Sequence, residues 1–345
     1  MATLISILVA VLILGVLVVV HEMGHFFVGR AVGIGVEEFS VGFGPKLASH
    51  LGKKGIRYSL RALPIGGYVR FVGEDQDDDR PDSMFRQPVW KRFVTVLAGP
   101  VMNLVLAVVL VVIVLMTYGE PMPDTVIAQV SEGQPAQAAG VQVDDRIVAV
   151  DGVEVATTDE AIAKISGAGE RPVELTVERG GQRVELTMTP EYNAEEGRNM
   201  IGIAFGTTRV RFGLLDSIKI GGAYTVQFVQ LIGETFSNLI FRGQGATDLM
   251  GPIGTIGVIS QQTQQGGLEA VLRLGAMISI NLGFFNLIPF PALDGGKLVL
   301  LVIEKIRRKP LPLQKEAYLN LAGLAVLLLL MIFASYQDIV RLFVH

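Results

Sequence analysis

Apolar residues occur in four long runs that polar stretches separate. Each run approaches the roughly 20 mainly apolar residues that a helix needs to cross a bilayer. The runs cover residues 4–20, 93–116, 270–290 and 318–335, and the third is the most polar. The pattern predicts a multi-pass α-helical membrane protein with about four transmembrane helices. We assign these helices to residues 1–30, 93–118, 265–296 and 316–340.

The first run differs from a cleaved signal peptide. Its start, MATLIS, has no basic residue, and no small-residue cleavage site follows the run. The run is also longer than the hydrophobic region of a signal peptide. We therefore expect it to be retained as a helix.

Strand-like patterns occupy the polar stretch between the first two runs. Residues 55–72 alternate apolar and polar side chains, with glycines between them, and residues 34–43 offer a partner strand. We expect residues 31–92 to form a membrane-associated β-hairpin and a loop. The acidic segment 74–82 is interpreted as a solvated linker, with a cation site as the weaker alternative.

The region between the second and third runs changes character. Residues 119–210 alternate short strand and helix patterns, with a hairpin at Gly180 and Gly181, and predict an inserted β-rich domain. Residues 211–245 carry an apolar stripe at helical spacing beside a polar face. We expect an amphipathic helix lying on the membrane, and a fifth transmembrane helix remains the alternative.

Composition supports a membrane protein and narrows its chemistry. Half of the 345 residues are hydrophobic, and the mean hydropathy is +0.48. The formal net charge of −4 gives no reason to expect nucleic-acid binding. The chain has no cysteine, which excludes disulfides and thiol nucleophiles, so a metal would have to bind His, Asp or Glu.

The distribution of basic residues predicts an orientation. Lys and Arg are frequent in residues 30–92 and again in residues 297–315. The positive-inside rule places both segments in the cytoplasm. Both termini and residues 119–265 then face the opposite side of the membrane.

The sequence HEMGH, residues 21–25, stands at the end of the first apolar run. His21 and His25 share one face of a helix, so both imidazoles can bind one metal ion. Glu22 projects beside them and can reach a water on the metal, as in zinc peptidases. The alternative is a set of interfacial polar residues without a metal. The position within a continuous apolar run favours the metal, because ionisable groups in membranes are expensive and usually functional.

A third ligand is expected because catalytic zinc normally takes three protein ligands. Asp294, in NLIPFPALDGG (286–296), follows a membrane-depth run and two helix-breaking prolines. Broken backbone is tolerated at that depth only beside protein or a cavity. Asp294 is therefore the best candidate, although Asp-Gly is also a common turn pair.

Together, HEMGH, GPVMN (99–103) and NLIPFPALDGG resemble the site-2 protease family of intramembrane zinc metalloproteases, and most closely its bacterial RseP type. The resemblance covers nearly the whole chain. It implies one catalytic Zn²⁺ held by His21, His25 and Asp294, with Glu22 as general base.

The resemblance also implies roles around the metal. Asn286 is similar in position to the family asparagine that holds the substrate or the oxyanion, and Asn103 would line the same cavity. Pro289 and Pro291 would shape it. An exposed edge of the β-hairpin would pair with the unwound substrate helix and offset part of the cost of unwinding.

The inserted domain resembles a PDZ domain. Residues 132–152 are similar to the PDZ core of bacterial proteases, and MIGIAF (200–205) is similar to the carboxylate-binding loop. The resemblance implies that Ile201, Gly202 and Ile203 form part of a groove that holds an extended peptide by strand addition.

The family resemblance implies partners and a location. The substrates would be single-pass membrane proteins, such as anti-sigma factors already cut by an upstream site-1-type protease, or remnant signal peptides. The chain would lie in the lipid of the bacterial inner membrane, with the PDZ domain and both termini periplasmic. The active site would lie near the cytoplasmic face.

Two features depart from the family pattern. The best-known RseP-type enzymes carry two PDZ domains, whereas this chain shows one. Lys297 stands where the family often has histidine after LDGG, and we expect little effect on metal binding.

Two other functions compete with proteolysis. The chain could be a membrane scaffold with a structural metal, but a structural site would not need Glu22. A metal transporter would need polar residues spread through all the spans, and the first and fourth lack them.

Overall fold

The computed structural model describes residues 2–74, 78–243 and 251–344. The chain divides into two compact units. The membrane unit comprises Met1–Val114 and Gly213–His345, and the inserted unit comprises Leu115–Phe212. Each unit is described by itself.

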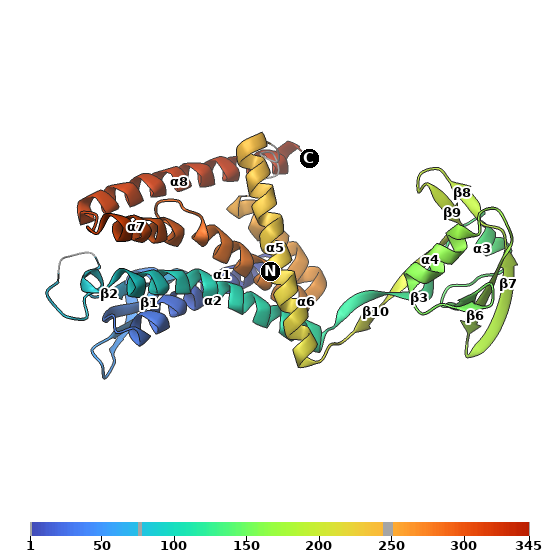
Figure 1. The fold of residues 1–345 in the computed structure, drawn as a ribbon, viewed down its shortest axis with the longest axis horizontal. Helices are drawn as coiled ribbons and strands as arrows, with labels where there is room; N and C mark the ends of the chain where they lie inside the picture. The colour runs from blue at the N-terminus through green and yellow to red at the C-terminus, as the bar shows by residue number, and fades with distance from the viewer. Residues whose placement is uncertain (1, 75–77, 244–250, 345) are drawn as a thin grey trace. The chain divides into compact units, whose positions relative to one another are not determined.

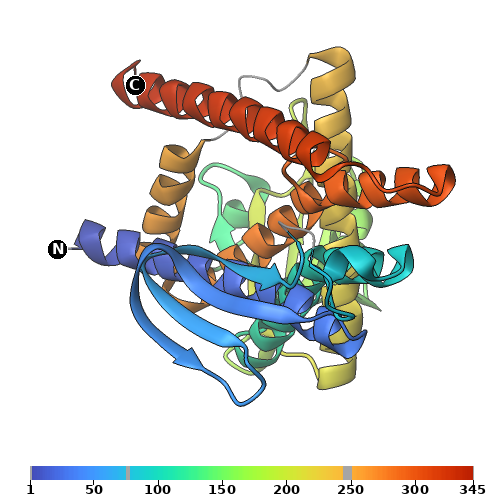
Figure 2. The ribbon, with the colours of Figure 1, turned by 90° about the vertical axis from the view of Figure 1, so that its left-hand side faces the viewer.

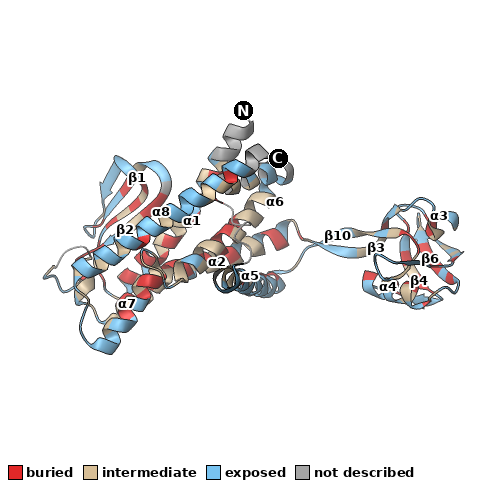
Figure 3. Ribbon diagram, turned by 90° about the horizontal axis from the view of Figure 1, so that it is seen from above, coloured by how far each residue is buried: buried red, intermediate tan, exposed pale blue. Residues whose placement is uncertain are grey.

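Within the described residues, four helices are long and apolar enough to cross a membrane, which confirms the predicted fold class. The candidate spans are Leu8–Ala31, Val89–Thr117, Gly266–Leu287 and Leu313–Val340. They belong to helices α1 (Ala2–Ala31), α2 (Val89–Thr117), α6 (Pro252–Leu287) and α8 (Leu313–Val344) (Figure 1). Most side chains of α8 are exposed (Figure 3), as expected of apolar residues that face lipid.

Small residues let the central helices approach closely. A Cβ atom at Gly24 of α1 would lie 2.4 Å from the carbonyl oxygen of Ala98 in α2. On the same face of α1, at seven-residue spacing from Gly24, Leu17 and Ala10 pack with Ile278 of α6. One face of α1 therefore contacts α6 at Ala10 and Leu17, and it contacts α2 at the end of the helix that carries the histidines.

The third span and the segment after it differ from the simple pattern expected. Helix α6 contains non-helical backbone at Gly267. The part of this helix that is apolar enough to span a membrane begins beside this break, at Gly266. The helix ends at Leu287, and an irregular loop leads to α7 (Asp294–Arg307). Helix α7 was missed in the sequence analysis, which treats residues 297–315 only as a polar segment.

The β-element consists of two long bent strands, β1 (Val36–Leu51) and β2 (Arg57–Phe71), beside α1 (Figure 2). Phe39 of β1 lies opposite both Tyr58 and Val69. The first half of β1 is thus sandwiched between the two halves of β2. Residues 67–71 form an outer strand that runs beside α1, and we call this segment the edge strand.

Two further elements complete the membrane unit. A short 3-10 helix, η1 (Met84–Arg86), precedes α2, and α5 (Leu214–Arg242) precedes α6. Helix α5 is amphipathic, and it is not among the candidate spans.

The inserted unit is rich in β-structure. Its strands are β3 (Glu120–Val130), β4 (Arg146–Val150), β5 (Val153–Glu154), β6 (Val173–Arg179), β7 (Gln182–Met188), β8 (Glu191–Asn193), β9 (Arg198–Met200) and β10 (Ile203–Val210). Its helices are α3 (Pro135–Ala138) and α4 (Thr158–Gly167). The main sheet has the order β10-β3-β4-β6-β7, and β6 and β7 form the hairpin expected at Gly180 and Gly181. Buried aliphatic residues from several strands form its core, among them Ile127, Ile147 and Leu175.

Candidate metal centre

Two imidazoles project from one face of α1. His21 and His25 lie one helical turn apart, and both are buried, with 7% and 9% of their surface exposed. Their Nε2 atoms are 3.1 Å apart. The local periodicity of the helix is sufficient to bring these two nitrogen atoms together.

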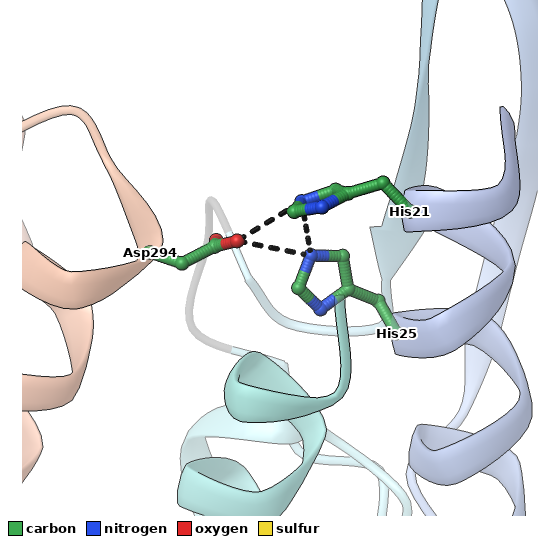
Figure 4. A group of neighbouring side chains, drawn as sticks. All are labelled: His21, His25 and Asp294. Carbon is green, nitrogen blue, oxygen red and sulfur yellow. Dashed lines mark hydrogen bonds and ion pairs between the residues drawn. The ribbon is translucent and has the colours of Figure 1, made fainter. Parts of the chain in front are cut away.

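Asp294 approaches them as the first residue of α7 (Figure 4). Its Oδ2 atom lies 3.0 Å from Nε2 of His21 and 3.3 Å from Nε2 of His25. The loop before α7 folds tightly against the helix, because a Cβ atom at Gly295 would lie 2.2 Å from the carbonyl oxygen of Ile288. The glycine after Asp294 is therefore required for the turn that delivers the carboxylate.

Second partners orient both rings. Nδ1 of His25 lies 2.8 Å from the carbonyl oxygen of Thr95, to which it can only donate. This fixes the tautomer whose Nε2 lone pair is free to bind a metal. The side-chain amide of Asn103 lies 3.2 Å from Nδ1 of His21. The structure places the amide nitrogen Nδ2 at this distance, whereas Oδ1 has no hydrogen-bond partner among the described residues. Turning the amide end for end would let Oδ1 accept from Nδ1–H and leave Nε2 of His21 free as well.

The three facing atoms fit a metal ion. Oδ2 of Asp294 has no hydrogen-bond partner among the described residues, although two ring nitrogens lie within ion-pair distance. Ligand atoms roughly 2.0–2.1 Å from a tetrahedral zinc lie about 3.3 Å from one another, close to the separations observed. Neutral imidazole nitrogens and a carboxylate oxygen are also donors that suit zinc.

The opposite wall of the site leaves room for the ion. A Cβ atom at Gly99 of α2 would lie 2.2 Å from Nε2 of His25 and 2.8 Å from Nε2 of His21. The missing side chain at this position thus keeps open the space in front of both ring nitrogens.

Asp294 is ionised in this setting. Burial acts to raise the pKa of its carboxyl group, but the two imidazoles that face the carboxylate outweigh burial and hold the pKa below its ordinary value. An ionised carboxylate beside two imidazoles is the form that binds a divalent cation.

Glu22 is held by the edge strand. Its Oε2 atom accepts a hydrogen bond from the backbone N–H of Val69 at 3.0 Å. Because Val69 belongs to the edge strand of β2, the β-element and the carboxylate beside the histidines are directly coupled.

A cavity of about 410 Å³ joins these groups. It is lined by His21, Glu22, His25, Asn103, Asn286 and Asp294, together with residues of the edge strand, α2 and α7. Asn286 therefore reaches the same cavity as the predicted ligands. Pro289 and Pro291 are not among its lining residues; they lie in the loop that leads to Asp294.

The remaining predicted residues lie in the inserted unit. Ile201, Gly202 and Ile203 line a separate groove with Ile162 and Ile165 of α4. Gly202 has a φ of +80°, and a Cβ atom there would lie 2.2 Å from Cβ of Gln134. A glycine is therefore required where the loop meets this neighbour.

Sequence reasoning missed several residues around the metal centre. Thr95 acts through its backbone and leaves no sequence signal, and the same is true of Val69. Gly99 lies in the GPVMN motif, which did mark the place. Glu74 and Lys297 form an ion pair at the cavity wall, with Nζ and Oε1 3.0 Å apart.

Comparison with protein families identifies one match over most of the chain. Residues 9–330 match the model of peptidase family M50. The described residues also contain one group of three His and Asp side chains able to hold a metal ion, which is His21, His25 and Asp294.

Several bacterial proteins are similar over nearly their whole length. A protein of Agrobacterium fabrum named as a zinc metalloprotease is 34% identical, over 95% of this chain and 94% of its own. The metalloprotease MmpA of Caulobacter vibrioides is 31% identical, over 95% and 94%. The regulator of sigma-W protease RasP of Bacillus subtilis is 28% identical, over 98% and 99%.

A solved structure resembles a smaller part of the chain. The PDZ domain of the SdrC-like protein from Listeria innocua is 24% identical and covers 24% of this chain and 92% of its own, with a TM-score of 0.22. A TM-score this low carries no weight for the fold.

Proposed function

This chain belongs to peptidase family M50 and is a multi-pass zinc metalloprotease, and from that premise we propose that it cleaves single-pass membrane proteins within their transmembrane segments. The observation that carries the proposal is the meeting of His21, His25 and Asp294 beside Glu22 in one cavity of the membrane unit.

His21, His25 and Asp294 would hold one catalytic zinc in this proposal. Bound zinc supplies a Lewis acid that polarises a peptide carbonyl and lowers the pKa of water. Thr95 keeps the ring of His25 in the tautomer that exposes Nε2. The family resemblance places Asn103 in the substrate cavity, and we add a role in orienting His21, with the amide oxygen turned to Nδ1, because the amide lies 3.2 Å from that atom.

Glu22 acts as the general base. It takes a proton from the attacking water and can return it to the amide nitrogen that leaves. The hydrogen bond from Val69 aims its carboxylate along the edge strand, where an extended substrate would lie. Asn286 reaches the cavity from the end of α6 and is placed in the proposal to bind the substrate carbonyl or the oxyanion.

The substrate enters as an unwound strand in this proposal. A transmembrane helix hides its peptide bonds within its own hydrogen bonds, so local unwinding must precede attack. Pairing with those backbone groups of the edge strand that are not already bonded to side chains replaces some of the hydrogen bonds that the helix loses. Pro289 and Pro291 contribute indirectly, by shaping the loop that positions Asp294.

The finer biological roles follow from the relatives and the charge pattern. The name of RasP, a regulator of sigma-W, supports substrates of the anti-sigma-factor type, cut first by an upstream site-1-type protease. Remnant signal peptides are also proposed as substrates, because they too present a single membrane-embedded helix. The basic segments support an inner-membrane orientation with the active site near the cytoplasmic face and both termini periplasmic.

The inserted unit acts in this proposal as a PDZ-type peptide-binding module. The groove at Ile201, Gly202 and Ile203 is apolar and lies beside β10, which suits an extended peptide with an apolar C-terminus. Such a module can read the new C-terminus that a first cleavage creates, or exclude substrates that are still intact.

The test is metal analysis and cleavage with the purified full chain in lipid. Wild type should contain one zinc per chain and cleave a single-pass transmembrane reporter, and a chelator should stop cleavage. Glu22→Gln should retain zinc but lose cleavage by at least about 100-fold, because the base is absent. Glu234→Gln, at an exposed site of α5, is the matched control and should cleave normally.

Two results would contradict the proposal. Cleavage by Glu22→Gln at the wild-type rate would exclude Glu22 as the base. A wild-type chain that binds zinc but cleaves no transmembrane reporter would favour the structural-metal scaffold instead.

A further inference from the structure

An ion pair crosses the wall of the metal cavity at a position to which the family resemblance assigns no role. Nζ of Lys297 lies 3.0 Å from Oε1 of Glu74, and both residues line the cavity. We propose that Glu74 and Lys297 are a positioning pair that ties helix α7, and with it Asp294, to the edge strand that holds Glu22. The inference rests on the proposed function and adds two residues to its machinery.

On one side, the pair controls the first turn of α7. Lys297 follows Asp294 by three residues, so both side chains leave the same region of the helix surface. The N–H of Lys297 also donates to the carbonyl of Leu293, the residue that precedes the helix. A shift of this turn would move Asp294 and Lys297 together.

On the other side, the pair ends on the edge strand. Oε2 of Glu74 accepts a hydrogen bond from the N–H of Phe71 at 3.2 Å, while Oε1 meets Lys297. Phe71 and Val69 are alternate residues, so their N–H groups lie on the same edge of the strand. Two carboxylates therefore occupy successive donors of this edge: Glu22 at Val69 and Glu74 at Phe71.

The strand between them is a firm connection. Phe71 is 5% exposed and packs with Phe26, Ile34 and Val36 in a buried cluster. Phe26 is the residue after His25 on α1. Contacts therefore run from the histidines of α1 through this cluster to Glu74. From Glu74 the ion pair continues to α7, which carries Asp294. Together these contacts surround the cavity.

A second ion pair holds the other end of α7. Arg92 of α2 pairs with Glu304 near the other end of α7, with Nη1 and Oε2 3.0 Å apart. That contact fixes the far end of the helix, more than two turns from Asp294. Lys297 and Glu74 secure the end that presents the metal ligand.

Charge and exposure suit a positioning role. The negative charge of Glu74 raises the pKa of Lys297, which outweighs the opposing effect of burial, so the ammonium group stays charged. The side chain of Lys297 is 37% exposed, and ion pairs with this exposure add little to the free energy of unfolding. Variants of the pair should therefore fold, and their defect should appear at the metal.

The decisive measurement is the zinc affinity of the full-length chain in detergent, by competition with a chelator. Lys297→Met removes a positive charge near a site for a dication. A purely electrostatic effect would therefore tighten zinc binding, whereas loss of positioning should weaken it. We expect zinc binding weakened about tenfold, as for outer partners of metal ligands. Unchanged or tighter binding would overturn the inference.

Further variants test whether the two residues act as a pair. Glu74→Gln retains an acceptor for the N–H of Phe71 but loses the charge, and it should weaken zinc binding as Lys297→Met does. The double variant should be no weaker than either single variant, because both remove one contact. Lys297→Arg should restore most of the affinity. Additive losses in the double variant would overturn the inference.

Controls separate this inference from the proposed function. Lys305→Met, at an exposed site of the same helix, changes the net charge equally and should bind zinc as wild type does. If wild type binds zinc and cleaves the reporter while the pair variants match it in zinc affinity, only the positioning pair is refuted. If wild type neither binds zinc nor cleaves, the proposed function itself fails.

Discussion

At the scale of single residues, the candidate metal centre depends on the absence of a side chain at residue 99 as well as on the three candidate ligands. The ring nitrogens of His21 and His25 face a wall that carries no side chain, because residue 99 is glycine. Thr95, one helical turn earlier on α2, uses its carbonyl to orient His25. The same stretch of α2 thus supplies both a hydrogen-bond acceptor and an empty space.

Gly99→Ala should therefore destroy the site without disturbing the helix. The new Cβ atom would overlap Nε2 of His25, although alanine is favoured over glycine within helices. We expect zinc affinity to fall by at least about 100-fold, measured as metal content and chelator competition. Gly222→Ala, where a Cβ atom meets nothing within 4 Å, is the control. Normal zinc binding in Gly99→Ala would contradict the geometry described for the site.

At the scale of elements, the edge strand connects the β-element with Glu22, the proposed base, and with Glu74. Its N–H groups at Val69 and Phe71 bind carboxylates, whereas the opposite edge of the same segment pairs with β1. Helix α7 contributes Asp294 from its first turn. The site is therefore assembled where the edge strand meets four helices, α1, α2, α6 and α7.

Val69→Pro isolates the contribution of the edge strand. Proline is tolerated on a strand edge whose N–H points away from the sheet, but it removes the donor that holds Glu22. We expect kcat/KM to fall at least about tenfold, while zinc content stays at the wild-type level.

Tyr68→Pro is the informative contrast to Val69→Pro. Tyr68 is the neighbouring residue, and it lies opposite Ser40 in the ladder with β1. Its replacement should destabilise the β-element itself, which a melting curve would detect. Equal activity of Val69→Pro and wild type would show that the hydrogen bond to Glu22 has no part in cleavage.

At the scale of the whole molecule, the proposed orientation makes a prediction about the two sides of the membrane. The chain has no cysteine, so single cysteines introduced at exposed sites report on access directly. Lys53 lies in the β-element and Glu185 in the inserted unit, and both are exposed. In spheroplasts, Glu185→Cys should react with an impermeant maleimide added outside, and Lys53→Cys should react only after permeabilisation. The reverse pattern would contradict the proposed orientation.

The sequence alone determined those features that depend on neighbours along the chain. Four apolar runs sufficed to predict four spanning helices, because each helix must be apolar over its own length. The spacing of His21 and His25 sufficed to place both rings on one face, because helical periodicity is local. The motif around Asp294 marked a third candidate ligand, and these motifs together predicted the protease family that the family match confirmed.

Only the tertiary structure decided how distant segments meet. Glu22 accepts a hydrogen bond from the N–H of Val69, and Glu74 pairs with Lys297, more than 200 residues away in the sequence. No periodic pattern in the sequence predicts either contact. From the sequence, Glu74 belongs to a segment interpreted as a solvated linker, and Lys297 is expected to have little effect on the metal. Helix α7 was also missed, since its glycine-rich start resembles a turn until the preceding loop packs against it. Backbone groups such as the N–H of Val69 and the carbonyl of Thr95 exist at every residue, so only the folded chain selects which of them serve the site.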